Sequence, residues 1–303
     1  MDKPKRVKGE WKRLTVQTAA FLLQNPKLNR FFLGTIEQGK TKSVCVPGLN
    51  CYSCPAAIGA CPIGSLQATL SGGYKKIAFP FYVLGFIMLF GLTLGRWICG
   101  WLCPFGWVQD LIYRIPFFKK LRTFRFDRVL RWLKYAVLGI LVIGLPLYSA
   151  LKGVLVPWFC KLLCPAGTLL GGIPLVIANE PLQGQIGFAF RWKVGVAFAI
   201  LLLSLLISRP FCRYLCPLGA IYGLFNRIAL VHLQYDEPTC VHCGVCETLC
   251  PMGIDPVTQF NSIECIRCGR CARVCPTDAL HVRFGFRKGG ESHKKSTKQP
   301  LQN

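Results

Sequence analysis

Eight cysteines near the C-terminal end constrain the fold of this chain more than any other feature. They form two runs with the same spacing, C-x2-C-x2-C-x3-C followed by proline: Cys240, Cys243, Cys246 and Cys250, then Cys265, Cys268, Cys271 and Cys275. Zinc ribbons use C-x2-C pairs, but a third cysteine two residues further on and then Cys-Pro, all given twice, is not their pattern. The spacing is the one that binds [4Fe–4S] clusters.

In this pattern the cysteine before proline in one run joins the first three cysteines of the other run. One expected ligand set is Cys240, Cys243, Cys246 and Cys275, and the other is Cys265, Cys268, Cys271 and Cys250. Gly244 and Gly269 are small enough to let backbone amides approach the cluster sulfurs. Residues 231–284 are therefore expected to fold as an α+β module that resembles the two-[4Fe–4S] bacterial ferredoxins.

Three runs without a charged residue precede this module and predict membrane-spanning helices. They are Ile77–Gly95, Tyr135–Leu151 and Val194–Ser208. A spanning helix needs about 20 mostly apolar residues, and Trp192 with the flanking cations can extend the third run at the membrane interface. Charged residues make up only 17% of the chain, against about 25% in soluble proteins, which also favours a membrane protein.

The distribution of Lys and Arg predicts the orientation. The 96–134 loop holds nine of them, whereas the 152–190 loop holds only Lys152 and Lys161. By the positive-inside rule the first loop is cytoplasmic and the second extracytoplasmic, which puts the C-terminal module in the cytoplasm. Six Lys or Arg within the first 13 residues also favour the inside, and this requires a further span near 14–34. The net charge of +24 is explained in this way, without binding to nucleic acid.

The expected fold is thus an α-helical membrane protein with about four transmembrane helices and a C-terminal ferredoxin-like module. Its expected parts are a basic segment with the first helix (1–35), an extracytoplasmic Cys-rich loop (36–76), a membrane domain (77–230), the double-cluster module (231–284) and a disordered basic tail (285–303). The chain is expected in the cytoplasmic membrane of a bacterium or archaeon, as a multi-pass protein.

Ten more cysteines precede the module, and four of them share the motif C-P-x-G. These are Cys61, Cys103, Cys164 and Cys216, and the last three have a second cysteine four residues earlier: Cys99, Cys160 and Cys212. With the expected topology the pairs Cys99/Cys103 and Cys212/Cys216 both face the cytoplasm. Together they supply the four thiolates that a cubane cluster needs, so a third cluster is predicted there.

Arg96 and Arg209 each stand three residues before the first cysteine of these two inner units. Two interpretations are open for them. They could offset the negative charge of four thiolates and raise the potential of a cluster, or they could be positive anchors at the membrane interface. Asp110, close to one unit, is expected to be an interfacial polar residue.

Six cysteines are expected on the outer face: Cys45, Cys51, Cys54, Cys61, Cys160 and Cys164. A further cluster could be held there by Cys61, Cys160, Cys164 and one of Cys45, Cys51 or Cys54, of which Cys54 is preferred. The alternative is disulfides among Cys45, Cys51 and Cys54, because the outer face is oxidising in many bacteria.

The spans with their C-x3-C-P motifs, followed by the double cysteine run, resemble the polyferredoxin membrane family over about 77–282. The motifs are Cys99-Gly-Trp-Leu-Cys103-Pro and Cys212-Arg-Tyr-Leu-Cys216-Pro. This family includes the quinol-dehydrogenase subunit of periplasmic nitrate reduction and the membrane flavoprotein that serves nitrous-oxide reductase. The resemblance implies electron transfer between the quinone pool or cytoplasmic donors and redox partners. The outer cysteine group and the third C-x3-C-P unit at Cys160 are departures from the nitrate-reductase pattern.

Two functions are therefore in competition. The first is a membrane-bound electron-transfer protein that passes electrons between cytoplasmic or quinone donors and a membrane or extracytoplasmic redox partner, as a quinol-dehydrogenase subunit would. The alternative is an assembly or metal-handling factor that reduces a metal ion in the membrane. No catalytic acid–base or nucleophile pair stands out in the sequence, and the expected partners are the membrane and redox proteins.

Overall fold

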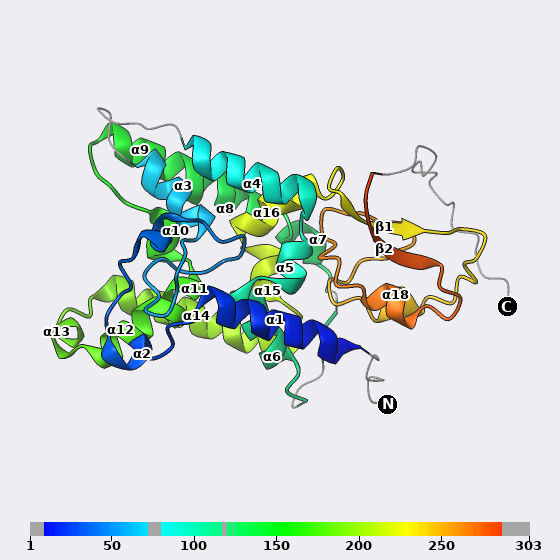
Figure 1. Ribbon diagram of the computed structural model, residues 1–303, viewed down its shortest axis with the longest axis horizontal. Coiled ribbons are helices and arrows are strands. Elements are labelled where there is room, and N and C mark those ends of the chain that lie inside the picture. Colours follow the sequence, from blue (N-terminus) through cyan, green and yellow to red (C-terminus); the bar gives the residue numbers. More distant parts are fainter. Residues whose placement is uncertain (1–8, 72–79, 117–119, 123, 287–303) are drawn as a thin grey trace.

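The computed structural model describes residues 9–71, 80–116, 120–122 and 124–286. Helices fill most of the length of the molecule, and the single pair of described strands lies at one end of its long axis (Figure 1). The expected basic tail after residue 286 lies outside the described residues, as do most of the N-terminal basic residues. The helical body contains the residues for which a membrane domain is expected, and the strand-containing end contains those of the expected C-terminal module.

The N-terminal part contains short helices joined by irregular chain: α1 (Glu10–Gln24), α2 (Arg30–Leu33), the 3-10 turn η1 (Lys40–Ser43) and α3 (Pro62–Leu70). The single span expected near 14–34 is therefore wrong as a continuous helix. Helix α1 ends where Asn25 leaves the helical conformation, and Pro26 follows it, so the chain resumes helical structure only at Arg30.

The helical body from α4 to α16 is built from one long helix, one broken helix and several short ones. In chain order these are α4 (Phe81–Thr93), α5 (Trp97–Trp101), α6 (Pro104–Tyr113), α7 (Asp127–Leu130), α8 (Leu133–Val137), η2 (Leu138–Gly144), α9 (Leu145–Leu151), α10 (Trp158–Leu162), α11 (Pro165–Gly167), η3 (Thr168–Gly172), α12 (Ile173–Ala178), α13 (Glu180–Gln183), α14 (Phe188–Leu206), α15 (Pro210–Tyr214) and α16 (Pro217–Phe225).

Two helical segments among the described residues are long and apolar enough to cross a membrane: Asp127–Leu151 and Phe188–Leu206. They contain the expected Tyr135–Leu151 run and most of the Val194–Ser208 run. The run Ile77–Gly95 forms α4, a shorter apolar helix over Phe81–Thr93, and its first three residues lie outside the described part. The chain is thus mostly helical, with two candidate spans.

Two π-helical stretches interrupt the apolar helices, and each directly precedes a proline. Segment η2 leads into Pro146 near the start of α9, and η3 leads into Pro174 near the start of α12. Proline has no N–H to donate and its ring crowds the carbonyl four residues earlier, so the preceding turn widens instead of breaking.

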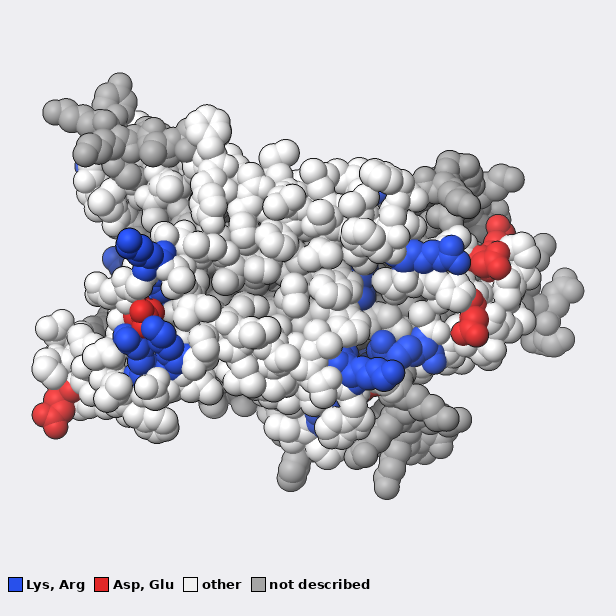
Figure 2. All heavy atoms as spheres, viewed as in Figure 1, with Lys and Arg blue, Asp and Glu red and all other residues white. Residues whose placement is uncertain are grey.

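Around its apolar core the helical body buries several charged side chains, and it exposes many large apolar ones on its surface. Arg96, Arg209 and Arg213 are fully buried, whereas Phe198 on α14 is 61% exposed and Leu23 on α1 is 74% exposed. On the face seen in Figure 2, charged residues gather toward the two ends of the long axis and leave an uncharged band between them. A surface of this kind fits contact with lipid rather than water.

The C-terminal module is a small α+β unit with an internal repeat. Strands β1 (Val231–Tyr235) and β2 (Leu280–Phe284) pair antiparallel, with Tyr235 opposite Leu280. The short helices α17 (Val245–Thr248) and α18 (Arg270–Val274) lie between them in sequence and contact each other. Left-handed backbone recurs at matching positions of the two cysteine runs: His242 with Arg267, Gly244 with Gly269, and Gly253 with Asp278.

Candidate iron–sulfur sites

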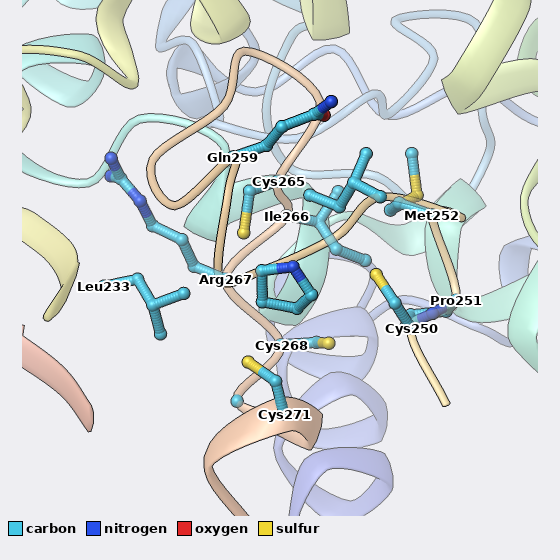
Figure 3. Close-up of a pocket in the computed structure, with 13 residues that line it drawn as sticks. Leu233, Cys250, Pro251, Met252, Gln259, Cys265, Ile266, Arg267, Cys268 and Cys271 are labelled. Atoms are coloured by element: carbon cyan, nitrogen blue, oxygen red, sulfur yellow. The ribbon is translucent and has the colours of Figure 1, made fainter. Parts of the chain in front are cut away.

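One of the two expected cluster sites of the C-terminal module is assembled in the structure. Cys250, Cys265, Cys268 and Cys271 line one pocket, together with Leu233 and Met252 among others (Figure 3). Each of the four thiols lies within electrostatic range of the other three. The cysteine before proline in the first run thus lies beside the second run, as the crossed ligand sets require.

The pocket suits a cationic iron cluster. Burial raises the pKa of Cys250 to about 12, and repulsion from the thiolates of Cys268 and Cys265 acts in the same direction. A thiol whose pKa is raised in this way gives up its proton most readily to a bound metal cation. When bound, a [4Fe–4S] cluster supplies a one-electron carrier at this position.

The second expected set of the module is brought together only in part. Cys243 and Cys246 lie within electrostatic range of each other, and Cys240 contacts Tyr235. The Sγ of Cys275 accepts a hydrogen bond from the N–H of Ala279 at 3.3 Å. The assignment of Cys240, Cys243, Cys246 and Cys275 to one cluster therefore continues to rest on the spacing and on the repeat.

The four C-P-x-G motifs are helix N-termini, and the structure explains each position of the motif. Cysteine is the extended N-cap residue of α3, α6, α11 and α16, and proline is the first helical residue, where its missing N–H is not needed. The glycine N–H points back to the cysteine: Gly219 donates to Cys216 Sγ at 3.3 Å and Gly167 to Cys164 Sγ at 3.4 Å. The motif therefore holds a sulfur at the positive end of a backbone turn.

The two inner units meet in the middle of the body. Each thiol of the inner set, Cys99, Cys103, Cys212 and Cys216, is buried and within electrostatic range of the other three. Gln109 joins the two units, because its Nε2 donates to Cys212 Sγ at 3.2 Å and its Oε1 accepts from the N–H of Phe211 at 3.1 Å. The donor set, four buried thiols with polar support, fits a cubane.

Arg96 and Arg209 cross between the inner units. Arg96 donates to the carbonyl of Cys212 at 3.1 Å, and Arg209 donates to the carbonyl of Cys99. Both are fully buried and ion-paired, Arg96 with Glu264 at 3.0 Å and Arg209 with Asp110 at 2.5 Å. The interpretation as interfacial anchors is therefore wrong, and so is the interfacial placement of Asp110, which is 6% exposed. The arginines stabilise the fold of the thiol site from inside.

The outer units meet in the same way at the other side of the body. Gln67 donates to Cys160 Sγ at 3.5 Å and accepts from the N–H of Phe159 at 3.0 Å, which repeats the contacts of Gln109. Of the remaining outer cysteines, Cys54 Sγ contacts Asn25 Oδ1 at 3.5 Å and Cys45 Sγ contacts Ser65 Oγ at 3.7 Å. Cys61, Cys160 and Cys164 are together, as expected, but Cys54 is directed elsewhere.

The thiols of these sets are spaced more widely than the ligands of a single metal ion. In the described part of the chain, no three His, Cys, Asp or Glu side chains are arranged to hold a single metal ion. A four-iron cubane is larger than an ion and keeps its thiolates further apart, so the grouped thiols are compatible with it.

The glutamines are functional candidates that the sequence interpretation missed. Gln67 and Gln109 each follow the cysteine of a C-P-x-G motif by six residues. This offset, present in two of the four units, is a signal that extends the repeat to C-P-x-G-x2-Q. Glu264 was also missed, because its partner Arg96 lies far away in sequence.

Comparison with known proteins finds two iron–sulfur families in this chain. A 4Fe-4S binding domain family matches residues 77–125, 135–175 and 188–233, and a second 4Fe-4S binding domain family matches 258–281. The chain is 34% identical to an uncharacterized protein of Methanocaldococcus jannaschii over 67% of its own length and 78% of that protein. No solved structure matches it.

Two further relatives have names, and one of them is named as a ferredoxin-type protein. The protein NirI of Paracoccus denitrificans is 31% identical over 67% of this chain, and the ferredoxin-type protein NapH of Haemophilus influenzae is 29% identical over 54%. The chain spans only 29% and 51% of these two relatives. With the matched domains and the grouped cysteines, they confirm the resemblance, and the chain belongs to the polyferredoxin-type family of 4Fe–4S electron-transport proteins.

Proposed function

We propose that this iron–sulfur protein passes electrons between cytoplasmic or quinone donors and a membrane or extracytoplasmic redox partner, and that the electrons cross between the C-terminal module and the inner cysteine set. The observation that carries the proposal is the contact between these two parts. The cysteine loop of the module, residues 262–268, is seated directly on the inner C-x3-C-P units.

The contact is close and specific. A Cβ added at Gly100, next to Cys99, would lie 2.4 Å from the carbonyl oxygen of Ile266, next to Cys265. Asn226 donates to the carbonyl of Cys265 at 2.7 Å, and Trp101 Nε1 donates to that of Arg267 at 3.1 Å. Since electron transfer slows steeply with distance, backbone contact between two thiol sites is the arrangement that a transfer path requires.

Buried charge at the same contact fixes the module in place. Glu264 of the module accepts hydrogen bonds from Arg96 at 3.0 Å and from Lys134 at 2.5 Å. Burial alone would raise the pKa of Glu264, but the two cations outweigh it and hold the pKa below its usual value. The carboxylate therefore stays ionised at neutral pH and anchors the module to the helix that carries Lys134.

The path also extends beyond the inner set. Tyr222 on α16 is fully buried and lies within electrostatic range of Cys99 and Cys103 on one side and Cys61 on the other. Its hydroxyl donates to the carbonyl of Pro47 at 3.2 Å. Tyr222 thus lies between the inner and the outer cysteines.

The orientation belongs to the same proposal. The exposed apolar side chains and the uncharged band of Figure 2 support several membrane passes. The Lys and Arg distribution supports a cytoplasmic module and an extracytoplasmic Cys51–Cys61 segment.

Single substitutions of the inner set test the proposal. In Cys103→Ser and Cys216→Ser we expect electron flow from a cytoplasmic-side reductant to an outer-side acceptor in proteoliposomes to cease, while the module keeps its two clusters. Cys45→Ser is the matched control, because this buried cysteine contacts Ser65 and belongs to neither set. Unchanged flow in Cys103→Ser would refute the assigned path.

A further inference from the structure

A fourth thiol completes the outer set, and it is not the one that the sequence favours. Cys51, Cys61, Cys160 and Cys164 each lie within electrostatic range of the other three. Two glycines confirm the geometry. A Cβ added at Gly167 would lie 3.5 Å from Cys51 Sγ and 3.7 Å from Cys164 Sγ, and one added at Gly64 would lie 3.9 Å from Cys160 Sγ.

These two glycines are the last residues of their own C-P-x-G motifs. Each turn glycine therefore lies next to a sulfur of another segment, at ordinary van der Waals distance from where its Cβ would stand. The outer set also repeats one feature of the inner set, since Gln67 makes to Cys160 and Phe159 the contacts that Gln109 makes to Cys212 and Phe211.

A buried cation lies beside the loop that carries Cys51. Lys42 is 3% exposed, and its ammonium donates to the carbonyls of Cys54 at 3.0 Å and Ala57 at 2.8 Å. No carboxylate of the described residues lies within ion-pair distance of it. Cys54, Cys51 and Glu37 interact with it electrostatically, in that order of strength. A buried ammonium needs negative charge nearby, and a thiolate at Cys51 would add to the charge of Glu37.

We propose that Cys51, Cys61, Cys160 and Cys164 bind a further [4Fe–4S] cluster at the outer end of the membrane domain, supported by Gln67 and Lys42. When bound, this cluster supplies a one-electron site on the outer side. The assignment excludes Cys54 as a ligand and excludes a Cys51–Cys54 disulfide in the loaded protein. It rests on contacts of the outer units alone, and so it stands or falls separately from the inner path.

Substitution of Cys51, compared with substitution of Cys54 three residues later, tests the proposed ligand set. The full chain and its variants Cys51→Ser and Cys54→Ser are purified anaerobically in detergent, and iron and acid-labile sulfide are measured per chain. Cys51→Ser should lose about four iron, and Cys54→Ser should keep the wild-type content. Equal iron content in both variants, or loss in Cys54→Ser alone, overturns the proposal.

A second variant keeps the test decisive if Cys51→Ser does not accumulate. Gln67→Met retains every cysteine but removes the hydrogen bond to Cys160 Sγ. We expect an unchanged iron count and a shifted midpoint potential for one cluster signal by electron paramagnetic resonance, because hydrogen bonds to sulfur tune the potential. Gln109→Met should shift a different signal. A spectrum and potential in Gln67→Met identical to wild type would contradict the outer site, whereas the same result in Gln109→Met would bear only on the inner one.

Discussion

Substitution of Gly100 by alanine tests whether the contact between the module and the inner set matters for function. The added Cβ would lie 2.4 Å from the carbonyl oxygen of Ile266, which is about 1 Å closer than an ordinary contact of some 3.5 Å. Both partners are backbone or attached directly to it, so no side chain can swing away. The loop of the module must move outward by a distance of that order.

The expected cost follows from the overlap. Overpacking of this kind destabilises by about 1–3 kcal/mol, and alanine recovers about 0.5–1 kcal/mol over glycine in helix α5. We therefore expect a small net loss of thermal stability, unchanged iron content and a slower transfer of electrons from the module to the membrane domain.

Stopped-flow absorbance measurements would follow reduction after the protein is mixed with a soluble reductant. The first phase is reduction of the module, and the second is transfer of electrons to the membrane domain. Gly195→Ala is the matched control, because a Cβ at Gly195 on α14 meets nothing within 4 Å. If Gly100→Ala behaves like Gly195→Ala in both stability and transfer rate, the contact is not the transfer path.

The remaining predictions concern charge and hydrogen bonding at the same sites. Glu264→Gln leaves Arg96 and Lys134 buried without their carboxylate and should destabilise by about 3–5 kcal/mol, measured by thermal unfolding in detergent. The folded pKa of Glu264 lies below its ordinary value of 4.5. The stability that its carboxylate contributes is therefore complete above about pH 5 and is lost as pH falls through the folded pKa. A stability difference between wild type and Glu264→Gln that grows on acidification would contradict this. Gln109→Met should lower the potential of one cluster, because a hydrogen bond to Cys212 Sγ is lost, and an unchanged or raised potential in redox titration would refute that role.

The sequence predicted the groups of cysteines better than the course of the chain. Fixed spacing determines which thiols of a short run can bind the same cluster. The motifs therefore predicted both the grouping of Cys250 with the 265–271 run and the inner set. Helix ends were less accessible. The break at Asn25 depends on a local turn, and the polar side chains of α1 face inward, where Gln17 donates to Asp110 and to the carbonyl of Gly100.

Other parts of the site depend on contacts that no local pattern contains. Spacing left both Cys51 and Cys54 as candidates, and they are separated by the placement of α11 beside Cys51 and by the contact of Cys54 with Asn25. The same holds for Arg96, whose partner Glu264 lies 168 residues away. The repeat of Gln67 and Gln109 was visible in the sequence, but its meaning appears only once each amide is seen to bridge two cysteine units.

The most direct test of the account is the iron and acid-labile sulfide content of the purified wild-type chain. Two clusters in the module, one in the inner set and one in the outer set predict about sixteen iron and sixteen sulfide per chain. About twelve would remove the outer site alone. A content of about eight, with only the signals of the module, would contradict the central claim that electrons pass from the module into the membrane domain through the Cys-Pro turns.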